Sequence, residues 1–401
     1  MLKSLFRKLQ GKPLEFKELA RSEPVPVSST LLGGILDSQI IRIEHHKGEC
    51  QTATGKEIAV DGSFDLPSFA TQATVFLSGW SLEYRNPDFW GHSDHHIWAA
   101  GTYISNSRIE DGKLRWEARG YLADGGQDDR YEWCYHYTVI AWDGNKLNCV
   151  ASHRDIENLS PSFGTTPLVS LPSYFHSNRL RSKKTCIPLP RGFVFHFGED
   201  HHLLHIAYNL THSENFVEHG KKYGVLPPPP LDDSTSKVNE GFVSWDTHGI
   251  FRDNNYLRKF KFYTWNSVLG GDEIGVVQPP FTTIPTIVRN NIASGLQGET
   301  TQEFTIENIP YDFAVPMLTG WELRYEFGDD EELTKMGVWL DDIQYGKLSV
   351  PTVDTGGTLR YKITSALYDR NKKPGYDFNH KVTILGFNPG RPNIPNAPVD
   401  L

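Results

Sequence analysis

Gly112-Lys-Leu-Arg-Trp116-Glu-Ala-Arg-Gly120-Tyr-Leu122-Ala-Asp124 is the stretch that decides the fold, because the chain repeats its pattern twice. The other copies are Gly241-Phe-Val-Ser-Trp245-Asp-Thr-His-Gly249-Ile-Phe251-Arg-Asp253 and Gly357-Thr-Leu-Arg-Tyr361-Lys-Ile-Thr-Ser365-Ala-Leu367-Tyr-Asp369. Counted from the first Gly, each copy has an apolar residue at +2, an aromatic at +4, a small residue at +8, an apolar residue at +10 and Asp at +12. Three gapless copies indicate an internal threefold repeat.

Further segments extend the repeat on both sides. Upstream, the matching segments are Gly79-Trp-Ser-Leu-Glu-Tyr84, Gly192-Phe-Val-Phe-His-Phe197 and Gly320-Trp-Glu-Leu-Arg-Tyr325. Each precedes an Asp-x-x-(Ile/Leu) segment: Asp94 to Ile97, Asp200 to Leu203, and Asp330 to Leu333. Downstream, the matching segments are Tyr137-Thr-Val, Tyr263-Thr-Trp and Val382-Thr-Ile, an alignment that makes the preceding loop three residues shorter in the second copy.

The spacing within these segments is that of β-strands. Trp80, Leu82 and Tyr84 alternate with period two and therefore share one face of a strand. Each unit supplies about five or six strands, enough for a small antiparallel sandwich. We predict an all-β fold of three tandem antiparallel β-sandwich units. The expected divisions are a leader (1–57), three units (58–152, 165–275 with an insertion, and 298–390) and an extended tail (391–401).

Two arrangements of the units are open: a pseudo-threefold ring, or a string of independently oriented sandwiches. Aromatic residues that recur at equivalent positions are expected in the core, and these are Trp116, Trp245 and Tyr361, together with Trp80, Phe193 and Trp321. Tryptophans that do not all recur are better candidates for exposed contact surfaces, and these are Trp90, Trp98, Trp133 and Trp339.

Composition excludes several classes of function. The net charge is −9 and the pI is about 6.0, so no basic field attracts a nucleic acid. No apolar run reaches the length of a transmembrane span, and the first residues lack the apolar region of a secretory signal peptide. We therefore expect a cytoplasmic protein, or one released without such a signal. No cofactor motif is present, so no cofactor is expected.

The four cysteines, Cys50, Cys134, Cys149 and Cys186, show no regular framework. Unpaired thiols in a reducing compartment are the simpler interpretation, and a Cys134–Cys149 bridge across a hairpin is the alternative.

The order of these segments resembles the H-type lectin domain. The matching pieces are Phe76-Leu-Ser-Gly-Trp80, Gly241-Phe-Val through Asp253, and Lys381-Val-Thr-Ile-Leu385, within a resemblance that covers about two-thirds of the chain. The resemblance implies six-stranded antiparallel sandwiches that assemble as trimers and bind sugars related to N-acetylgalactosamine or galactose.

The resemblance also implies where sugar would bind: in the turn after the Gly-started strand, through a His and a Tyr, with an Arg from the preceding strand. The residues at these turns, and the tyrosines beyond them, are Asp124, Tyr131, Arg252, Asp253, Tyr256, Tyr368, Asp369 and Tyr376. The family's His is absent from all three copies, and Trp98, Leu204 and Thr334 stand in place of its Arg. For the three Asp residues, capping of a turn is the favoured alternative to ligand binding.

Histidines cluster twice, and His95, His201 and His205 are the candidate metal ligands. Because adjacent residues of a strand face opposite ways, His95 and His96 cannot both reach one ion. The third copy has Asp330-Glu-Glu at this place, which favours a polar strand start over a retained metal site.

Three functions are therefore considered, and the favoured one is a non-catalytic lectin for carbohydrate or glycoprotein, made multivalent by three sites per chain. The alternative is a structural component, such as a fibre, spike or shell subunit, that forms homo-oligomers or contacts other proteins through its sandwich units. The third is a glycan-acting enzyme, since glycosidase carboxylates need no local motif.

Overall fold

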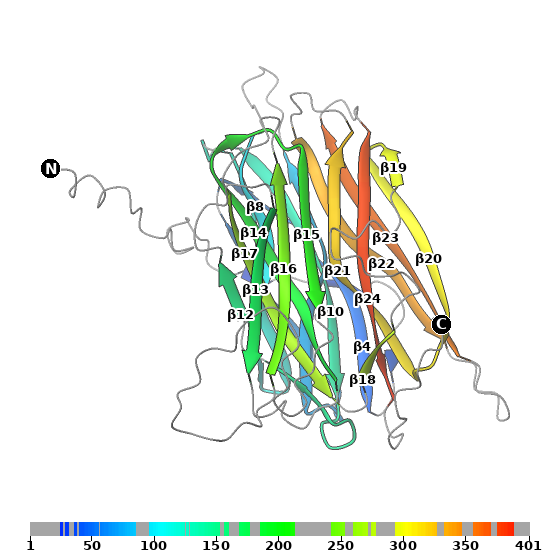
Figure 1. Ribbon diagram of the computed structural model, residues 1–401. Coiled ribbons are helices and arrows are strands. Elements are labelled where there is room, and N and C mark those ends of the chain that lie inside the picture. Colours follow the sequence, from blue (N-terminus) through cyan, green and yellow to red (C-terminus); the bar gives the residue numbers. More distant parts are fainter. Residues whose placement is uncertain are drawn as a thin grey trace, which may run out of the picture.

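The computed structural model describes residues 25–388 with internal gaps. The residues left out are 1–24, 27–28, 32–35, 38–39, 56, 86–95, 125, 128, 153–155, 160–167, 177–184, 213–241, 253–259, 272–273, 278–292, 327–332, 347–355, 370–374 and 389–401. Long strands run side by side through the molecule, and the described residues form no helix (Figure 1). The predicted all-β fold class is confirmed.

Each repeat supplies five strands in the same order. Unit 1 supplies β6 (Ile58–Asp65), β7 (Gln72–Tyr84), β8 (Ile97–Glu110), β9 (Lys113–Ala123) and β10 (Arg130–Trp142). Unit 2 supplies β13 (Leu168–His176), β14 (Thr185–His201), β15 (His205–His212), β16 (Phe242–Arg252) and β17 (Phe260–Gly271). Unit 3 supplies β20 (Glu299–Ile309), β21 (Phe313–Tyr325), β22 (Leu333–Gly346), β23 (Gly357–Asp369) and β24 (Tyr376–Phe387).

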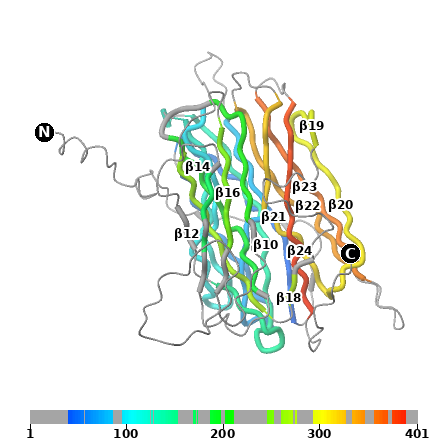
Figure 2. The backbone as a smooth tube through the Cα atoms, in the orientation of Figure 1, coloured from blue at the N-terminus to red at the C-terminus, as the bar shows by residue number. Residues whose placement is uncertain are grey.

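Every sheet is shared between two units. Three strands of one unit are continued by two strands of the next, which gives the 1/2 sheet (β6-β9-β8-β14-β17) and the 2/3 sheet (β13-β16-β15-β21-β24). The 3/1 sheet (β20-β23-β22-β7-β10) joins the last unit back to the first (Figure 2). Three such seams close a ring, so the units form the pseudo-threefold arrangement rather than a string of separate sandwiches.

The three seams have the same register. In each, five residues that begin with the Gly of the Gly-aromatic motif pair with five residues of the preceding unit. The pairs are Gly192–His196 with Ala99–Tyr103, Gly320–Arg324 with His205–Asn209, and Gly79–Glu83 with Lys335–Trp339. Equal registers place equivalent side chains in equivalent positions, which makes the three sheets directly comparable.

The aromatic residue of this motif lies at the centre of the ring. The ring centroids of Trp80, Phe193 and Trp321 are 5.2 Å, 5.0 Å and 5.0 Å apart in the three pairings, and all three side chains are buried. Burial of large aromatic rings in mutual contact stabilises the centre where the units meet. The predicted core positions Trp116, Trp245 and Tyr361 are also buried.

Nine short strands extend the sheets. The leader supplies β1 (Val25–Pro26), β2 (Ser29–Leu31), β3 (Leu36–Asp37), β4 (Ile41–Gly48) and β5 (Gln51–Thr54). The other four are β11 (Cys149–Ala151), β12 (Ile156–Leu159), β18 (Ile274–Val277) and β19 (Ala293–Leu296). Except for the parallel pair of β1 and β6, they pair antiparallel, with β4, β10, β17 or β24. The predicted tail and the polyproline insertion of unit 2 lie outside the described residues.

The strand registers correct one part of the sequence alignment. Gly79, Gly192 and Gly320 pair with His136, Trp265 and Lys381 of the last strands. The residues equivalent to Tyr137 and Val382 are therefore Asn266 and its successors, not Tyr263-Thr-Trp. The preceding loop has the same length in all three copies. Each pairing also has an irregularity at one residue, Ser78, Arg191 or Thr319, a β-bulge that the three units share.

The predicted Cys134–Cys149 bridge is wrong, and the prediction of unpaired thiols holds only for Cys149 and Cys186. Cys50 and Cys134 form a disulfide that ties the turn between β4 and β5 to the middle of β10, while Cys149 and Cys186 are buried thiols. Cys134 and Cys50 come together because β5 pairs with β10 in the same sheet. The sequence held no signal for this, since the leader strands had no counterpart in the repeat.

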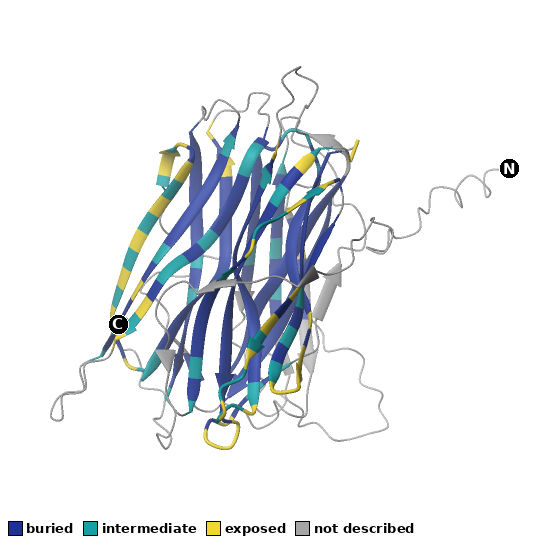
Figure 3. Ribbon diagram, turned by 180° about the vertical axis from the view of Figure 1, so that it is seen from behind, coloured by how far each residue is buried: buried dark blue, intermediate teal, exposed yellow. Residues whose placement is uncertain are grey.

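The prediction that Trp133 forms an exposed contact surface is also wrong. Its side chain is fully buried, and its indole nitrogen donates a hydrogen bond to Thr102 Oγ1 at 3.1 Å. Trp98 and Trp339 are half-buried, and Trp90 lies outside the described residues. Figure 3 shows buried residues along the long strands, with exposed residues at strand ends and along the edge strand β20.

Candidate functional site

The three sheets differ in the row of residues that crosses each seam at the Gly of the Gly-aromatic motif. In this row the Gly is flanked by one residue from the third strand of the preceding unit and one residue from the last strand of its own unit. The flanking pairs are Tyr103 and Trp265 in the 1/2 sheet, Trp339 and His136 in the 3/1 sheet, and Asn209 and Lys381 in the 2/3 sheet. Because Gly has no side chain, the two flanking residues decide whether the space above it is filled.

Two of the three rows are closed by stacked rings. Tyr103 and Trp265 stack over Gly192 with their ring centroids 3.9 Å apart and their planes within 7°. His136 and Trp339 stack over Gly79 with centroids 5.7 Å apart. A Cβ on Gly192 or Gly79 would lie 2.2 Å from atoms of Tyr103 or Trp339, so neither row has free space.

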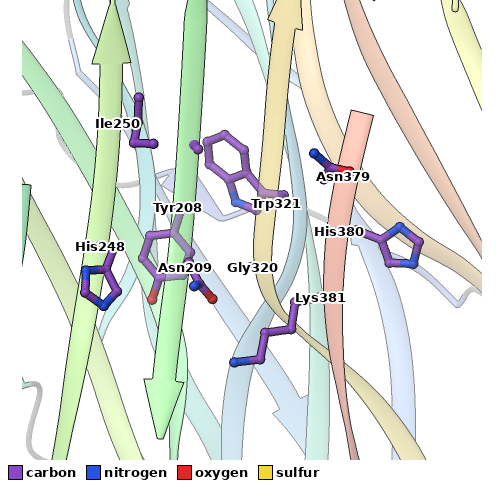
Figure 4. A pocket seen from close by; sticks show the side chains of 10 residues that line it. Tyr208, Asn209, His248, Ile250, Gly320, Trp321, Asn379, His380 and Lys381 are labelled. Atoms are coloured by element: carbon purple, nitrogen blue, oxygen red, sulfur yellow. The ribbon is translucent and has the colours of Figure 1, made fainter. Parts of the chain in front are cut away.

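The third row is open. On the 2/3 sheet, Asn209 and Lys381 flank Gly320, and a cleft lies over them with about 330 Å³ of empty space, counting the part open to solvent. His248 and Ile250 of β16 and Asn379 of β24 are among the other lining residues (Figure 4). Ala207 of β15 also lines the cleft. The enclosed part of the cleft is about 20 Å³, room for about one water molecule, so a larger ligand would lie mostly across the open surface above it.

Lys381 is the main charge in this cleft. Its Nζ donates a hydrogen bond to the backbone oxygen of Leu210 at 3.0 Å. Burial lowers the pKa of Lys381 to about 8, because the charged ammonium loses water that the protein does not replace. The pKa of His248 is also lowered, by burial first and by the charge of Lys381, while Asp246 opposes the shift.

Asn209 adds an unused hydrogen-bonding group. Its Oδ1 is buried and accepts no hydrogen bond from the residues that the structure describes, and it lies 3.0 Å from where a Cβ on Gly320 would be. A buried amide oxygen without a partner costs free energy, and a ligand donor would recover it once the Asn209 side chain turns toward the cleft. Together, the amide of Asn209, the imidazole of His248 and the ammonium of Lys381 offer both donors and acceptors.

A carboxylate network lies in the next row of the same face. Glu322 Oε1 is 2.9 Å from His205 Nε2, and Glu322 Oε2 accepts a hydrogen bond from Asn379 Nδ2 at 2.7 Å. Burial disfavours the charge, but the contacts with His205 and Asn379 and the charge of Arg324 outweigh it and lower the pKa of Glu322. This side chain is therefore an ionised acceptor at neutral pH.

Two of the four predicted tyrosine ligands are core residues. Tyr131 and Tyr376 are fully buried, and their hydroxyls donate to the backbone oxygens of Gly120 and Ser365, 3.1 Å and 2.9 Å away. Gly120 and Ser365 are the small residues at +8 of the repeat. The recurrence of these tyrosines thus reflects a shared packing contact, which leaves no exposed surface for a sugar.

The other predicted ligand residues are spread over the three sheets. The Asp124 carboxylate accepts the amide of Gly126 at 3.1 Å, which is the turn-capping role. Tyr368 and Asp369 end β23 in the 3/1 sheet, and Arg252 ends β16 in the 2/3 sheet. Asp253 and Tyr256 lie outside the described residues. The structure therefore does not bring the described members of this set together at one place.

The histidines give no metal centre within the described residues. His205 is buried against Glu322, His95 lies outside the described residues, and the side chain of His201 is not described. The single described group close enough to share an ion is Cys50, Glu132 and Cys134, and its two sulfurs form the disulfide.

Sequence reasoning missed Asn209, His248, Glu322 and Lys381. A signal for Asn209 was present, because the residues six positions after the aligned Ile97, Leu203 and Leu333 are Tyr103, Asn209 and Trp339. One polar residue among two aromatic ones marks a position where the repeats differ in role. The incorrect alignment at Tyr263 hid the matching contrast between Trp265 and Lys381.

Within the described part of the chain, no apolar helix long enough to cross a bilayer is present. The chain matches no family model, no curated protein and no solved structure.

Proposed function

We propose that this chain is a non-catalytic carbohydrate-binding protein, as its resemblance to H-type lectins suggests, and that it binds sugar in the cleft over Gly320. The observation that carries the proposal is the contrast across the ring: one row holds polar side chains around a cleft where two equivalent rows hold stacked aromatic rings.

The side chains around the cleft suit a sugar. Hydroxyl groups both donate and accept, so they match the amide of Asn209 and the imidazole of His248, which line the cleft. Ile250 and Ala207 offer apolar surface for the C–H groups of the ring. Because one of the three rows is open, we propose one site of this kind per chain, where the sequence predicted three. A galactose-like sugar remains the first choice.

The lowered pKa of Glu322 favours binding over hydrolysis. A glycosidase needs a carboxylic acid whose pKa is raised so that it stays protonated until it donates. Glu322 has the opposite shift. Its contacts with His205 and Asn379 suit a structural acceptor rather than a general acid.

A glycan microarray probed with the full chain tests this proposal. The matched variant carries Asn209→Tyr and Lys381→Trp, which copies into the 2/3 sheet the ring pair that closes the 1/2 sheet. We expect the wild-type chain to bind a subset of glycans and the folded variant to bind none of them. Absence of any bound glycan, or equal binding by the variant, would reject the proposal.

The edge strand β20 supports the second candidate, a structural or assembly component. Its residues alternate between exposed and half-buried along most of the strand, and β23 is its one partner in the described sheet. An open edge of this length can accept a strand from another chain, although Glu299, Glu303 and Glu307 work against close pairing of identical edges. Light scattering on the purified chain distinguishes the candidates, since an assembly component forms large particles.

A further inference from the structure

The charge balance of the cleft over Gly320 points to a narrower class of ligand than a neutral sugar. Lys381 has one partner for its ammonium among the described residues, the neutral backbone oxygen of Leu210. No carboxylate of the described residues forms an ion pair with it. An ammonium that is partly withdrawn from water without an opposite charge is unfavourable, so a compensating anion would be bound strongly.

Lys335 shows what this fold does with a comparable lysine. Its ammonium lies 2.8 Å from Glu299 and 3.7 Å from Glu83 in the 3/1 sheet. Burial alone would lower the pKa of Lys335, but these carboxylates reverse the effect and raise it. The same fold therefore neutralises one half-buried lysine with its own acids and leaves the lysine of the cleft without them.

The acidic groups near the cleft form no ion pair with Lys381 among the described residues. Glu322 is held by His205 and Asn379, and the charge of Asp246 acts on His248. Asn209, which lies on the other side of Gly320 from Lys381, has an uncharged amide and therefore cannot neutralise the ammonium. The groups that face Lys381 thus leave its positive charge available to a ligand.

We infer that the ligand of this cleft is an acidic saccharide, whose carboxylate or sulfate ester pairs with Lys381 while its hydroxyls contact Asn209 and His248. The inference rests on the proposed function and narrows its substrate class. The carboxylate and the sulfate ester are both compact oxyanions attached to a sugar ring, and either can accept a charge-assisted hydrogen bond from the Lys381 ammonium.

Isothermal titration of the full chain tests the inference with four probes: methyl galactoside, methyl galacturonide, galactose 6-sulfate, and inorganic sulfate alone. We expect at least one acidic sugar to bind about tenfold more tightly than the neutral sugar, and inorganic sulfate to bind weakly. Lys381→Met should remove the preference, and Lys381→Arg should keep part of it. Lys362→Met is the matched control, because Lys362 pairs with Asp342 on another sheet.

The acidic preference should also weaken as the pH rises through about 8, where the ammonium of Lys381 loses its proton. Equal binding of neutral and acidic sugars, or an acidic preference that survives Lys381→Met, overturns the inference and leaves the proposed function standing. No binding of any sugar rejects both. Binding of inorganic sulfate as tight as that of galactose 6-sulfate overturns the saccharide part. A preference for galacturonide over the sulfated sugar, or the reverse, identifies the acid group.

Discussion

The 1/2 and 2/3 sheets have the same strand register at the seam, but they differ in the side chains that flank the seam Gly. Both place a Gly at the seam with five paired residues of the same register. In the 1/2 sheet the flanking Tyr103 and Trp265 stack and exclude any ligand, whereas in the 2/3 sheet Asn209 and Lys381 leave a polar cleft. Two side chains on an unchanged backbone thus distinguish a structural position from a candidate site.

This contrast is possible because the pseudo-threefold ring repeats its backbone three times. The buried triangle of Trp80, Phe193 and Trp321 holds the centre of the ring, so the outward row of each seam is free to differ without loss of the fold. Function can then reside in the one seam whose row departs from the pattern.

The largest expected effect concerns stability at the closed row. Trp265→Ala removes a buried indole and its stacking on Tyr103, and we expect the free energy of unfolding to fall by about 3–5 kcal/mol. Lys381→Ala at the equivalent position should lower it by less than about 1 kcal/mol, because little packing is lost and an ammonium without an acidic partner among the described residues is removed. Urea denaturation followed by tryptophan fluorescence measures both. Similar losses in the two variants would show that the rows do not differ as described.

A smaller effect is expected when the open row is closed. The double substitution Asn209→Tyr and Lys381→Trp should raise the free energy of unfolding by about 1 kcal/mol, the usual contribution of an aromatic pair beyond its buried area. It also removes a cation that has no acidic partner among the described residues. The same urea titration measures the change, and a marked loss of stability would mean that the 2/3 sheet cannot accept the ring pair of the 1/2 sheet.

The last expected effect is a change in pH dependence rather than in stability at a single pH. The pKa of Lys381 is about 8 in the folded chain, below the ordinary value of 10.5, so the unfolded chain binds more protons between these pH values. The residue therefore makes the free energy of unfolding rise as the pH rises through this window. Lys381→Met should flatten that rise, as measured by urea denaturation at several pH values. An unchanged slope would show that the folded pKa of Lys381 is close to its ordinary value.

Much of the fold followed from the sequence. The +2, +4, +8, +10 and +12 pattern identified β9, β16 and β23, and the Gly-aromatic segments identified the strands that meet at the centre. Side chains that recur in order do so because each unit buries the same face of the same strands. The sharing of sheets between units was not predictable, because strand pairing across a seam depends on tertiary contacts that leave no local pattern.

The candidate site was not predicted. Attention to recurring residues selected Asp124, Tyr131 and Tyr376, and recurrence in this fold marks packing and turn capping. Asn209 and Lys381 belong to different units and are 172 positions apart in the sequence. They flank the same residue, Gly320, only because of the register in which β15, β21 and β24 pair. Sequence spacing carries no information about that register, so the informative signal was the break in the repeat rather than the repeat itself.

The most direct measurement is a crystal structure of the full chain soaked with the tightest-binding glycan from the array. We expect density for the sugar over Gly320, in contact with Asn209, His248 and Lys381. Density at the turns that follow β9 or β23, around Asp124 or Asp369, or an empty cleft with sugar bound elsewhere, would contradict it.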